Sequence, residues 1–143
     1  MGVIGVEYLH DDQMKKKILQ EAKIIAIVGI SDNPQRDSFR VAKYLQEKGY
    51  RIIPVNPFIP EVLGEVAFPD LQSIPFPVDI VDVFRRESEL PAVINQALEI
   101  GSRIIWLQEG LSYPQGRALA KAGNAILIED YCLKVEHARL IGK

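Results

Sequence analysis

An apolar run that ends in a glycine is the feature that most restricts how this chain can fold. Residues 24–29 are apolar and mostly β-branched up to Gly29, and small polar residues then lead into a helical pattern. This order is typical of the first βα unit of a parallel sheet. Such a turn gathers backbone N–H groups and a helix N-terminus in one place, which suits a phosphate. We therefore predict that residues 29–31 hold a phosphorylated cofactor.

Four further apolar runs continue the pattern, at residues 50–55, 78–84, 103–107 and 125–128. Helical patterns alternate with most of these runs, at residues 11–22, 37–48, 88–101, 114–122 and 133–141. The exception is the connection at residues 58–77, where four prolines predict irregular structure. Alternating strands and helices indicate an α/β protein. We expect a Rossmann-like, doubly wound parallel sheet of five strands in a three-layer αβα arrangement. Right-handed crossovers favour the strand order 3-2-1-4-5, with a ligand at the switch between strands one and four.

Length and charge limit the class of protein. The 143 residues suit one domain spanning residues 1–143, with residues 1–10 as a loose N-terminal arm. The net charge of −2 argues against a nucleic-acid partner. The single cysteine favours a reducing cytoplasm, and no apolar stretch is long enough to predict a membrane span. The sequence also shows no cluster of metal ligands. A homodimer is one assembly that it permits.

The residues at the predicted carboxyl ends of the strands narrow the choice of cofactor. A dinucleotide site favours G-x-G-x-x-G and an acid at the end of strand two. Here Ser31 and Pro34 stand where the later glycines would be, and strand two ends in Asn56-Pro57. These departures weigh against NAD, and the Walker A pattern is absent. What remains is a turn that suits a phosphate. The alternative is that Gly29 only allows a tight turn, in which the polar side chains form hydrogen bonds to nearby backbone groups and bind no ligand.

Five blocks of sequence resemble the small stand-alone CoA-binding proteins, which are similar to the N-terminal domain of the succinyl-CoA ligase alpha subunit. The blocks are residues 27–36, 53–57, 78–85, 106–110 and 130–137. The resemblance implies that the first turn takes the diphosphate of coenzyme A, that Asn56-Pro57 takes the adenosine end, and that the ends of strands three and four take the pantetheine arm. The candidate cofactor-binding residues are Gly29, Ile30, Ser31, Asn33, Arg36, Lys43, Asn56, Pro57, Phe84, Arg85, Gln108, Gly110 and Cys132.

Two positions depart from the family pattern. Phe58-Ile59 stand where relatives often carry a basic residue for the ribose 3′-phosphate, so that role would pass to Arg36, Arg40 or Lys43. Tyr131 replaces an arginine that relatives tend to have before the late cysteine.

No residue is predicted to be catalytic. The ligases work through a phosphorylated histidine in a second domain, which the matching blocks do not include. Cys132 fits a packed core residue, or a thiol that faces the thiol of CoA. Asp79 and Asp82, three apart in strand three, point to opposite faces and form no carboxylate pair.

We expect a protein that binds CoA or an acyl-CoA without catalysis of its own. Two alternatives remain: an NAD(P)-linked oxidoreductase module, and a protein-interaction domain with a vestigial nucleotide site.

Overall fold

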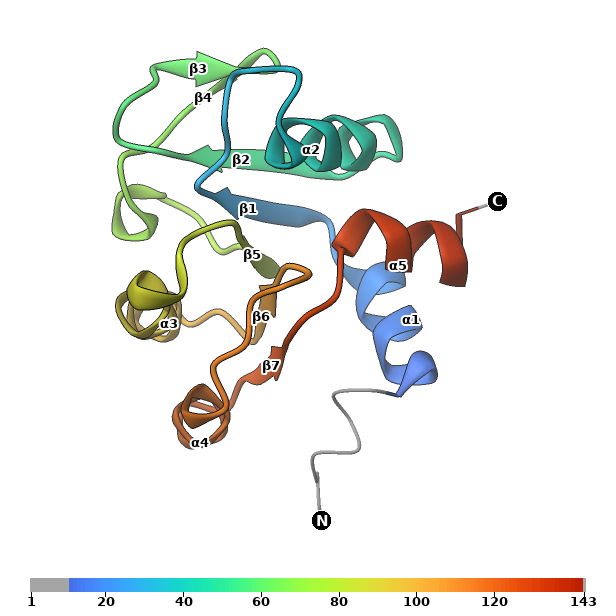
Figure 1. Cartoon of the computed structure of the whole chain (residues 1–143), viewed down its shortest axis with the longest axis vertical. Helices are drawn as coiled ribbons and strands as arrows, with labels where there is room; N and C mark the ends of the chain where they lie inside the picture. Colours follow the sequence, from blue (N-terminus) through green and yellow to red (C-terminus); the bar gives the residue numbers. More distant parts are fainter. Residues whose placement is uncertain (1–10, 143) are drawn as a thin grey trace.

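The computed structural model describes residues 11–142 and shows a five-stranded parallel sheet between two layers of helices (Figure 1). The predicted fold class is thereby confirmed, while the predicted arm at residues 1–10 lies outside the described residues. The strands are β1 (Ile24–Val28), β2 (Arg51–Val55), β5 (Ile80–Val83), β6 (Ile104–Leu107) and β7 (Ile126–Ile128). The helices are α1 (Asp12–Glu21), α2 (Asp37–Glu47), α3 (Leu90–Glu99), α4 (Gln115–Ala122) and α5 (Leu133–Leu140).

The strand order is β2-β1-β5-β6-β7, which is 2-1-3-4-5 in order along the chain. The predicted order 3-2-1-4-5 is therefore wrong. The outer edge of β2 is taken by Phe68, whose N–H donates to the carbonyl of Pro54 and whose carbonyl accepts from the N–H of Asn56, both at 2.9 Å. The next strand must then pair with the other side of β1. Asp79 fixes it there by accepting hydrogen bonds from the N–H groups of Lys23 and Ile24.

This order moves the switch point of the sheet. The chain leaves β1 for β2 on one side and returns to β5 on the other, so the switch lies between β1 and β5 and not between strands one and four. In open α/β sheets a ligand binds outside the carboxyl ends of the strands at this point. The observed strand order therefore places the ends of β1 and β5 side by side at the expected ligand position.

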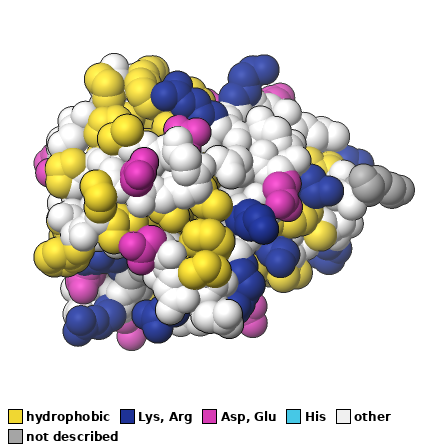
Figure 2. All heavy atoms as spheres, turned by 90° about the horizontal axis from the view of Figure 1, so that it is seen from above, with side chains coloured by type: hydrophobic (Ala, Val, Ile, Leu, Met, Phe, Trp, Pro, Cys, Tyr) yellow, Lys and Arg dark blue, Asp and Glu magenta, His cyan; other side chains and the backbone are white. Residues whose placement is uncertain are grey.

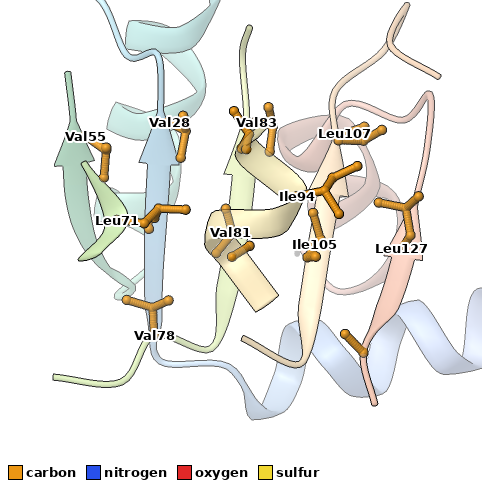
Figure 3. Packing of buried hydrophobic residues seen from close by; sticks show 14 of the residues in the cluster. Val28, Val55, Leu71, Val78, Val81, Val83, Ile94, Ile105, Leu107 and Leu127 are labelled. Carbon is orange, nitrogen blue, oxygen red and sulfur yellow. The ribbon is translucent and has the colours of Figure 1, made fainter. Parts of the chain in front are cut away.

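Alternate residues of each strand face opposite helical layers. In β1, Ile25 and Ile27 pack toward α1, α2 and α5, whereas Ala26 and Val28 pack toward α3 and α4. Figure 3 shows the second cluster, in which Val28, Val81, Val83 and Ile105 of the sheet meet Ile94 of α3. Both faces of the sheet are covered, which explains why its strands are apolar without alternation.

The connection after β2 is irregular, as its prolines predict. It forms a short antiparallel hairpin, β3 (Glu61–Val62) and β4 (Glu65–Val66), and then a single 3₁₀ turn, η2 (Leu71–Ser73). A second 3₁₀ turn, η3 (Glu87–Glu89), leads into α3. None of the helices within residues 11–142 is long and apolar enough to cross a membrane.

Candidate functional site

The turn after β1 is the tightest point of the carboxyl edge. Gly29 has a φ of +86°, and a Cβ at this position would lie 2.1 Å from the carbonyl oxygen of Phe84 and 2.8 Å from Cδ of Arg85. Glycine is therefore required both by the backbone conformation and by the closeness of the β5 end. The N–H of Gly29 donates to Val55 and the N–H of Phe84 donates to Val28, so the ends of β2, β1 and β5 form one unit.

The loop after Gly29 is held by its own polar groups. The N–H of Ser31 donates to Oγ of Ser38 at 2.9 Å, and Oγ of Ser31 accepts from the N–H of Asn33 at 3.0 Å. Oδ1 of Asn33 accepts from the N–H of Gln35 at 2.9 Å. Asn33 thus shapes the loop, while the Ser31 hydroxyl keeps a proton that it can donate to a ligand.

The N-terminus of α2 faces a hollow at this loop. Arg36 is its N-cap residue, and the cap makes no side-chain hydrogen bond. The first N–H groups of a helix have no partner within the helix, so they remain available to an anion here. Arg36 is exposed and forms no ion pair with any residue in 11–142. The hollow has a volume of about 370 Å³. It is lined by Gly29, Ser31, Gln35, Arg36, Asp37, Ser38 and Phe84.

A second hollow of about 310 Å³ adjoins the first and shares Asp37 and Phe84 with it. Its lining comes from α2, from the ends of β5 and β6, and from the start of α5. The remaining lining residues are Arg40, Val41, Gln108, Glu109, Cys132, Lys134 and Val135. We call the two hollows together the carboxyl-edge groove. It runs from the turn after β1 to the residues that follow β7.

The far end of the groove is fixed by contacts between two loops. Gln108 is 6% exposed, and its Oε1 accepts from the N–H of Leu133 at 3.1 Å. Half-buried Cys132 is the N-cap residue of α5. Gly110 donates its N–H to Oδ1 of Asp130 at 2.7 Å, which ties the loop after β6 to the loop after β7.

Several predicted residues contribute to the groove indirectly or lie outside it. The side-chain amide of Asn56 is already hydrogen-bonded within the protein: Nδ2 donates to the carbonyl of Ile30, and Oδ1 accepts from the N–H of Phe58. The Ile30 side chain is fully buried, so only its backbone can reach a ligand. Lys43 lies farther along α2, 4.0 Å from Glu47. Lys43, Asn33, Asn56, Pro57 and Gly110 are not among the side chains that line the two hollows.

Arg85 stays near the groove but is already paired. Its Nε donates to Oε1 of Glu89 at 2.6 Å, and its side chain lies over Gly29. The positive charge that remains unpaired at the turn is therefore that of Arg36 and not that of Arg85.

The sequence prediction omits some residues that line the groove. Ser38 and Gln35 border the first hollow, and Glu109, Lys134 and Val135 border the second. Ser38 could have been found as a serine at the helix start beside a phosphate turn. Lys134 could have been found as the residue two positions after Cys132, in the first turn of the predicted last helix.

Beneath the groove, the face covered by α2 and α5 buries a carboxyl group. Asp82 is fully buried between Ile27 of β1 and Trp106 of β6, and neither of its oxygens has a hydrogen-bond partner among the described residues. Burial raises the pKa of Asp82 well above its ordinary value. The group is therefore uncharged over a wider pH range than a surface aspartate.

An ionic cluster joins α1 to α5 beside the groove. Nζ of Lys15 lies 2.8 Å from Oε1 of Glu136 and 3.4 Å from the centre of the Tyr131 ring. Arg139 bridges Glu136 to both oxygens of Asp12. Burial by itself would raise the pKa of Glu136, but hydrogen bonds from Arg139 and Lys15 outweigh it and hold the pKa below its ordinary value.

His137 lies on the same helix and contacts α2. Its Nδ1 is 2.9 Å from the hydroxyl of Tyr44. Burial, aided by the charge of Lys48, lowers the pKa of His137, so the neutral ring is favoured. The described residues include no group of His, Cys, Asp and Glu that could hold a metal ion.

Comparisons with known proteins agree with this geometry. A family described as a CoA binding domain matches residues 23–138. YneT, an uncharacterized protein of Bacillus subtilis (strain 168), is 46% identical over 123 residues, which cover 86% of this chain and 91% of YneT. A hypothetical protein from Pyrococcus horikoshii OT3 is 33% identical with a TM-score of 0.90, over 99% of this chain and 100% of that chain.

A larger enzyme contains the same fold. The dinucleotide forming acetyl-coenzyme A synthetase 1 of Ca. Korarchaeum cryptofilum, solved in complex with phosphate and ADP, matches with a TM-score of 0.64 and 19% identity. The match covers 73% of this chain and 25% of that enzyme. At this identity the likeness concerns the fold.

The parallel sheet and the groove at its carboxyl edge define a Rossmann-like α/β domain. Within that class, the match over residues 23–138 shows that the chain belongs to the CoA binding domain family. The resemblance of the sequence blocks to CoA-binding proteins is thereby confirmed.

Proposed function

We propose that this protein binds coenzyme A or an acyl-CoA along the carboxyl-edge groove, without catalysis of its own. The observation that carries the proposal is that the two hollows adjoin at Asp37 and Phe84 and together extend from the N-terminus of α2 to Cys132. One end suits a diphosphate because it offers backbone N–H groups, the Ser31 hydroxyl and the unpaired Arg36. The other end offers apolar walls from Val41 and Val135.

The length of the groove fits the pantetheine arm. Cys132 lies beside the end of β6, because the N–H groups of Tyr131 and Leu133 donate to Leu107 and Gln108. Neighbouring parallel strands lie roughly 4.8 Å apart, so the end of β6 stands two strands, or roughly 10 Å, from the end of β1. An extended chain advances roughly 1.2 Å per bond, and about a dozen bonds separate the diphosphate from the sulfur of CoA. A ligand with its diphosphate at Gly29 would therefore carry its sulfur to the vicinity of Cys132.

Thermal-shift titration with CoA, acetyl-CoA, NAD and NADP tests the proposal. At a CoA concentration about 100 times Kd, we expect a stabilisation of roughly 2.7 kcal/mol, seen as a rise of several degrees in Tm. Arg36→Ala should lose most of this shift. Lys43→Ala is the matched control, because it removes an exposed cation of α2 that does not line the groove. Stabilisation by NAD or NADP alone would instead support an oxidoreductase module.

The orientation of the ligand can be tested through Cys132, the only cysteine of the chain. With the disulfide of CoA as oxidant, the Cys132 thiolate would attack one sulfur, form a mixed disulfide and release one CoA thiolate. Intact-mass measurement should show one CoA adduct that dithiothreitol removes and Cys132→Ser abolishes. An unmodified folded protein whose cysteine still reacts with iodoacetamide would contradict this orientation.

A second candidate function rests on the surface beyond β2. Phe58 is 87% exposed and Val66 is 67% exposed, and both belong to the connection that carries the β3–β4 hairpin. Figure 2 shows hydrophobic side chains gathered toward the side of the molecule where this hairpin lies. Exposed apolar patches often mark interaction sites. Absence of any shift with all four nucleotides would favour an interaction domain with a vestigial site.

A further inference from the structure

Gln108 is a buried amide with one half of its hydrogen-bonding capacity unused. Its side chain lines the second hollow although the residue is only 6% exposed. Oε1 accepts from the N–H of Leu133, which fixes the orientation of the amide and leaves Nε2 as the other group. Nε2 has no partner among the residues that the structure describes. Nε2 is not among the fully buried atoms that lack a partner, so it faces the open hollow, where water or a ligand can accept from it.

We propose that Nε2 of Gln108 donates a hydrogen bond to the thioester carbonyl oxygen of an acyl-CoA, so that the site prefers an acylated ligand to free CoA. The inference rests on the proposed function and specifies the form of the ligand. When the pantetheine arm displaces water from the hollow, a free thiol offers Nε2 only a weak acceptor in its place. A thioester adds a carbonyl oxygen two bonds beyond the sulfur, where the groove passes Cys132.

The start of α5 beside Nε2 favours the negative end of a carbonyl dipole. Lys134 and Val135, in the first turn of α5, line the same hollow, and the N–H groups of a first helical turn point toward the helix N-terminus. The charged side chains that line the hollow are Asp37, Arg40, Glu109 and Lys134, and their formal charges cancel. Val41 and Phe84 provide apolar walls in this hollow of about 310 Å³.

Calorimetric titration with three ligands tests the assignment. They are CoA, acetyl-CoA, and S-ethyl-CoA, a thioether that keeps the size of the acetyl group and lacks the carbonyl. For the unmodified protein we expect acetyl-CoA to bind roughly fivefold more tightly than S-ethyl-CoA, which is the effect of one ordinary hydrogen bond. Because the two ligands carry the same charge, the ratio of their Kd values isolates the carbonyl.

Two variants give the test its specificity. Gln108→Glu, titrated at pH 8, keeps an oxygen for the N–H of Leu133 and replaces the donor by an acceptor, while Gln108→Met removes both interactions. The ratio should fall to about one in each variant. A ratio of one in the unmodified protein, or a ratio that persists in both variants, would overturn the assignment. An equal loss of affinity for all three ligands would also do so, because it would place Nε2 on the pantetheine arm. Failure of CoA and both derivatives to bind the unmodified protein would refute the proposed function itself.

Discussion

The two faces of the sheet are built from different chemistry. On the face covered by α3 and α4, the core consists mostly of hydrophobic side chains, among them Val81, Ile94 and Leu127 (Figure 3). Glu129, buried at the rim of this face, pairs with Arg117 of α4. The face covered by α1, α2 and α5 is equally buried but also encloses Lys15, Asp82, Glu136 and His137. The apolar face holds its ion pair at the rim, where Arg117 is 40% exposed, whereas the mixed face places charged and polar groups inside the core, where they must be paired or held neutral.

The difference teaches which side of the molecule positions the groove. Both helix N-termini of the groove, those of α2 and α5, belong to the mixed face, and Lys15, Glu136 and His137 fix α5 against α1 and α2. The apolar face contributes no helix to the groove. We therefore expect substitutions on the mixed face to change both stability and ligand binding, and those on the apolar face to change stability alone.

The largest effect is expected from Glu136→Gln. The variant leaves the Lys15 ammonium, 1% exposed, without its counter-charge, and breaking such a buried pair costs about 3–5 kcal/mol. The measurement is urea unfolding at pH 7. The double variant Lys15→Met with Glu136→Gln should recover much of the loss, because no uncompensated charge remains. A cost below about 1 kcal/mol for the single variant would show that the buried ion pair does not distinguish the mixed face from the apolar face.

The same pair predicts how stability responds to acid. Because the folded-state pKa of Glu136 lies below its ordinary value, its contribution is present above the unfolded value of about 4.3 and is lost as pH falls through the folded value. Between pH 6 and pH 3, the free energy of unfolding should therefore decrease more steeply with falling pH for the unmodified protein than for the double variant. Urea unfolding at each pH measures it.

Ile94→Ala tests the apolar face. Ile94 is fully buried on α3, and its truncation leaves a cavity that costs about 2–5 kcal/mol. The affinity for CoA should not change when it is measured well below Tm. Ile94→Val, which removes a single methyl group, provides a graded control at about 1 kcal/mol. A large loss of affinity in Ile94→Ala would show that the two faces are coupled.

Asp82→Asn should stabilise the protein by about 1–2 kcal/mol at pH 8. The folded-state pKa of Asp82 is raised, so the stability of the neutral form is fully present below the unfolded value of about 3.9 and is lost as pH rises through the folded value. The asparagine does not ionise. Unfolding of both proteins across pH 4 to 9 should therefore show a difference that grows with pH, and a constant difference would contradict the interpretation.

The smallest effect is expected from Ser38→Ala. It removes the acceptor for the N–H of Ser31 and should cost about 1 kcal/mol while weakening CoA binding. Ser102→Ala is the matched control, because Ser102 is also buried but donates to the carbonyl of Ile104 at the opposite end of β6. If both variants lose the same stability but only Ser38→Ala loses affinity for CoA, the position of the site is supported. Equal losses of affinity would contradict it.

Much of this fold could be predicted because strand and helix periods are local properties. The apolar run before Gly29 and its successors gave five strands in place, and the Gly29 turn was found from its neighbours alone. The strand order could not be predicted in this way, because it is set by contacts between residues far apart in the sequence. It depends on Phe68 occupying the edge of β2 and on Asp79 accepting from the N–H groups at the start of β1, and neither contact has a signature in the sequence near it.

The candidate site shows the same limit. Gly29, Ser31, Phe84, Gln108 and Cys132 follow strand ends, and the structure places them along one groove. Asn56 shows what residue type cannot tell: its amide is a plausible ligand donor in sequence, but in the fold it holds the carbonyl of Ile30. Lys43 differs for a similar reason, since proximity in sequence to the turn does not decide which side of α2 a residue occupies.

The bridge between Phe68 and β2 also bears on how copies of this protein can meet. An exposed strand edge offers unpaired N–H and C=O groups to another chain. Here Phe68 already takes the carbonyl of Pro54 and the N–H of Asn56, and a proline has no N–H to offer. A continuous sheet across two copies therefore cannot start at this end of β2. Association on this side of the molecule would have to use side chains such as Phe58 and Val66.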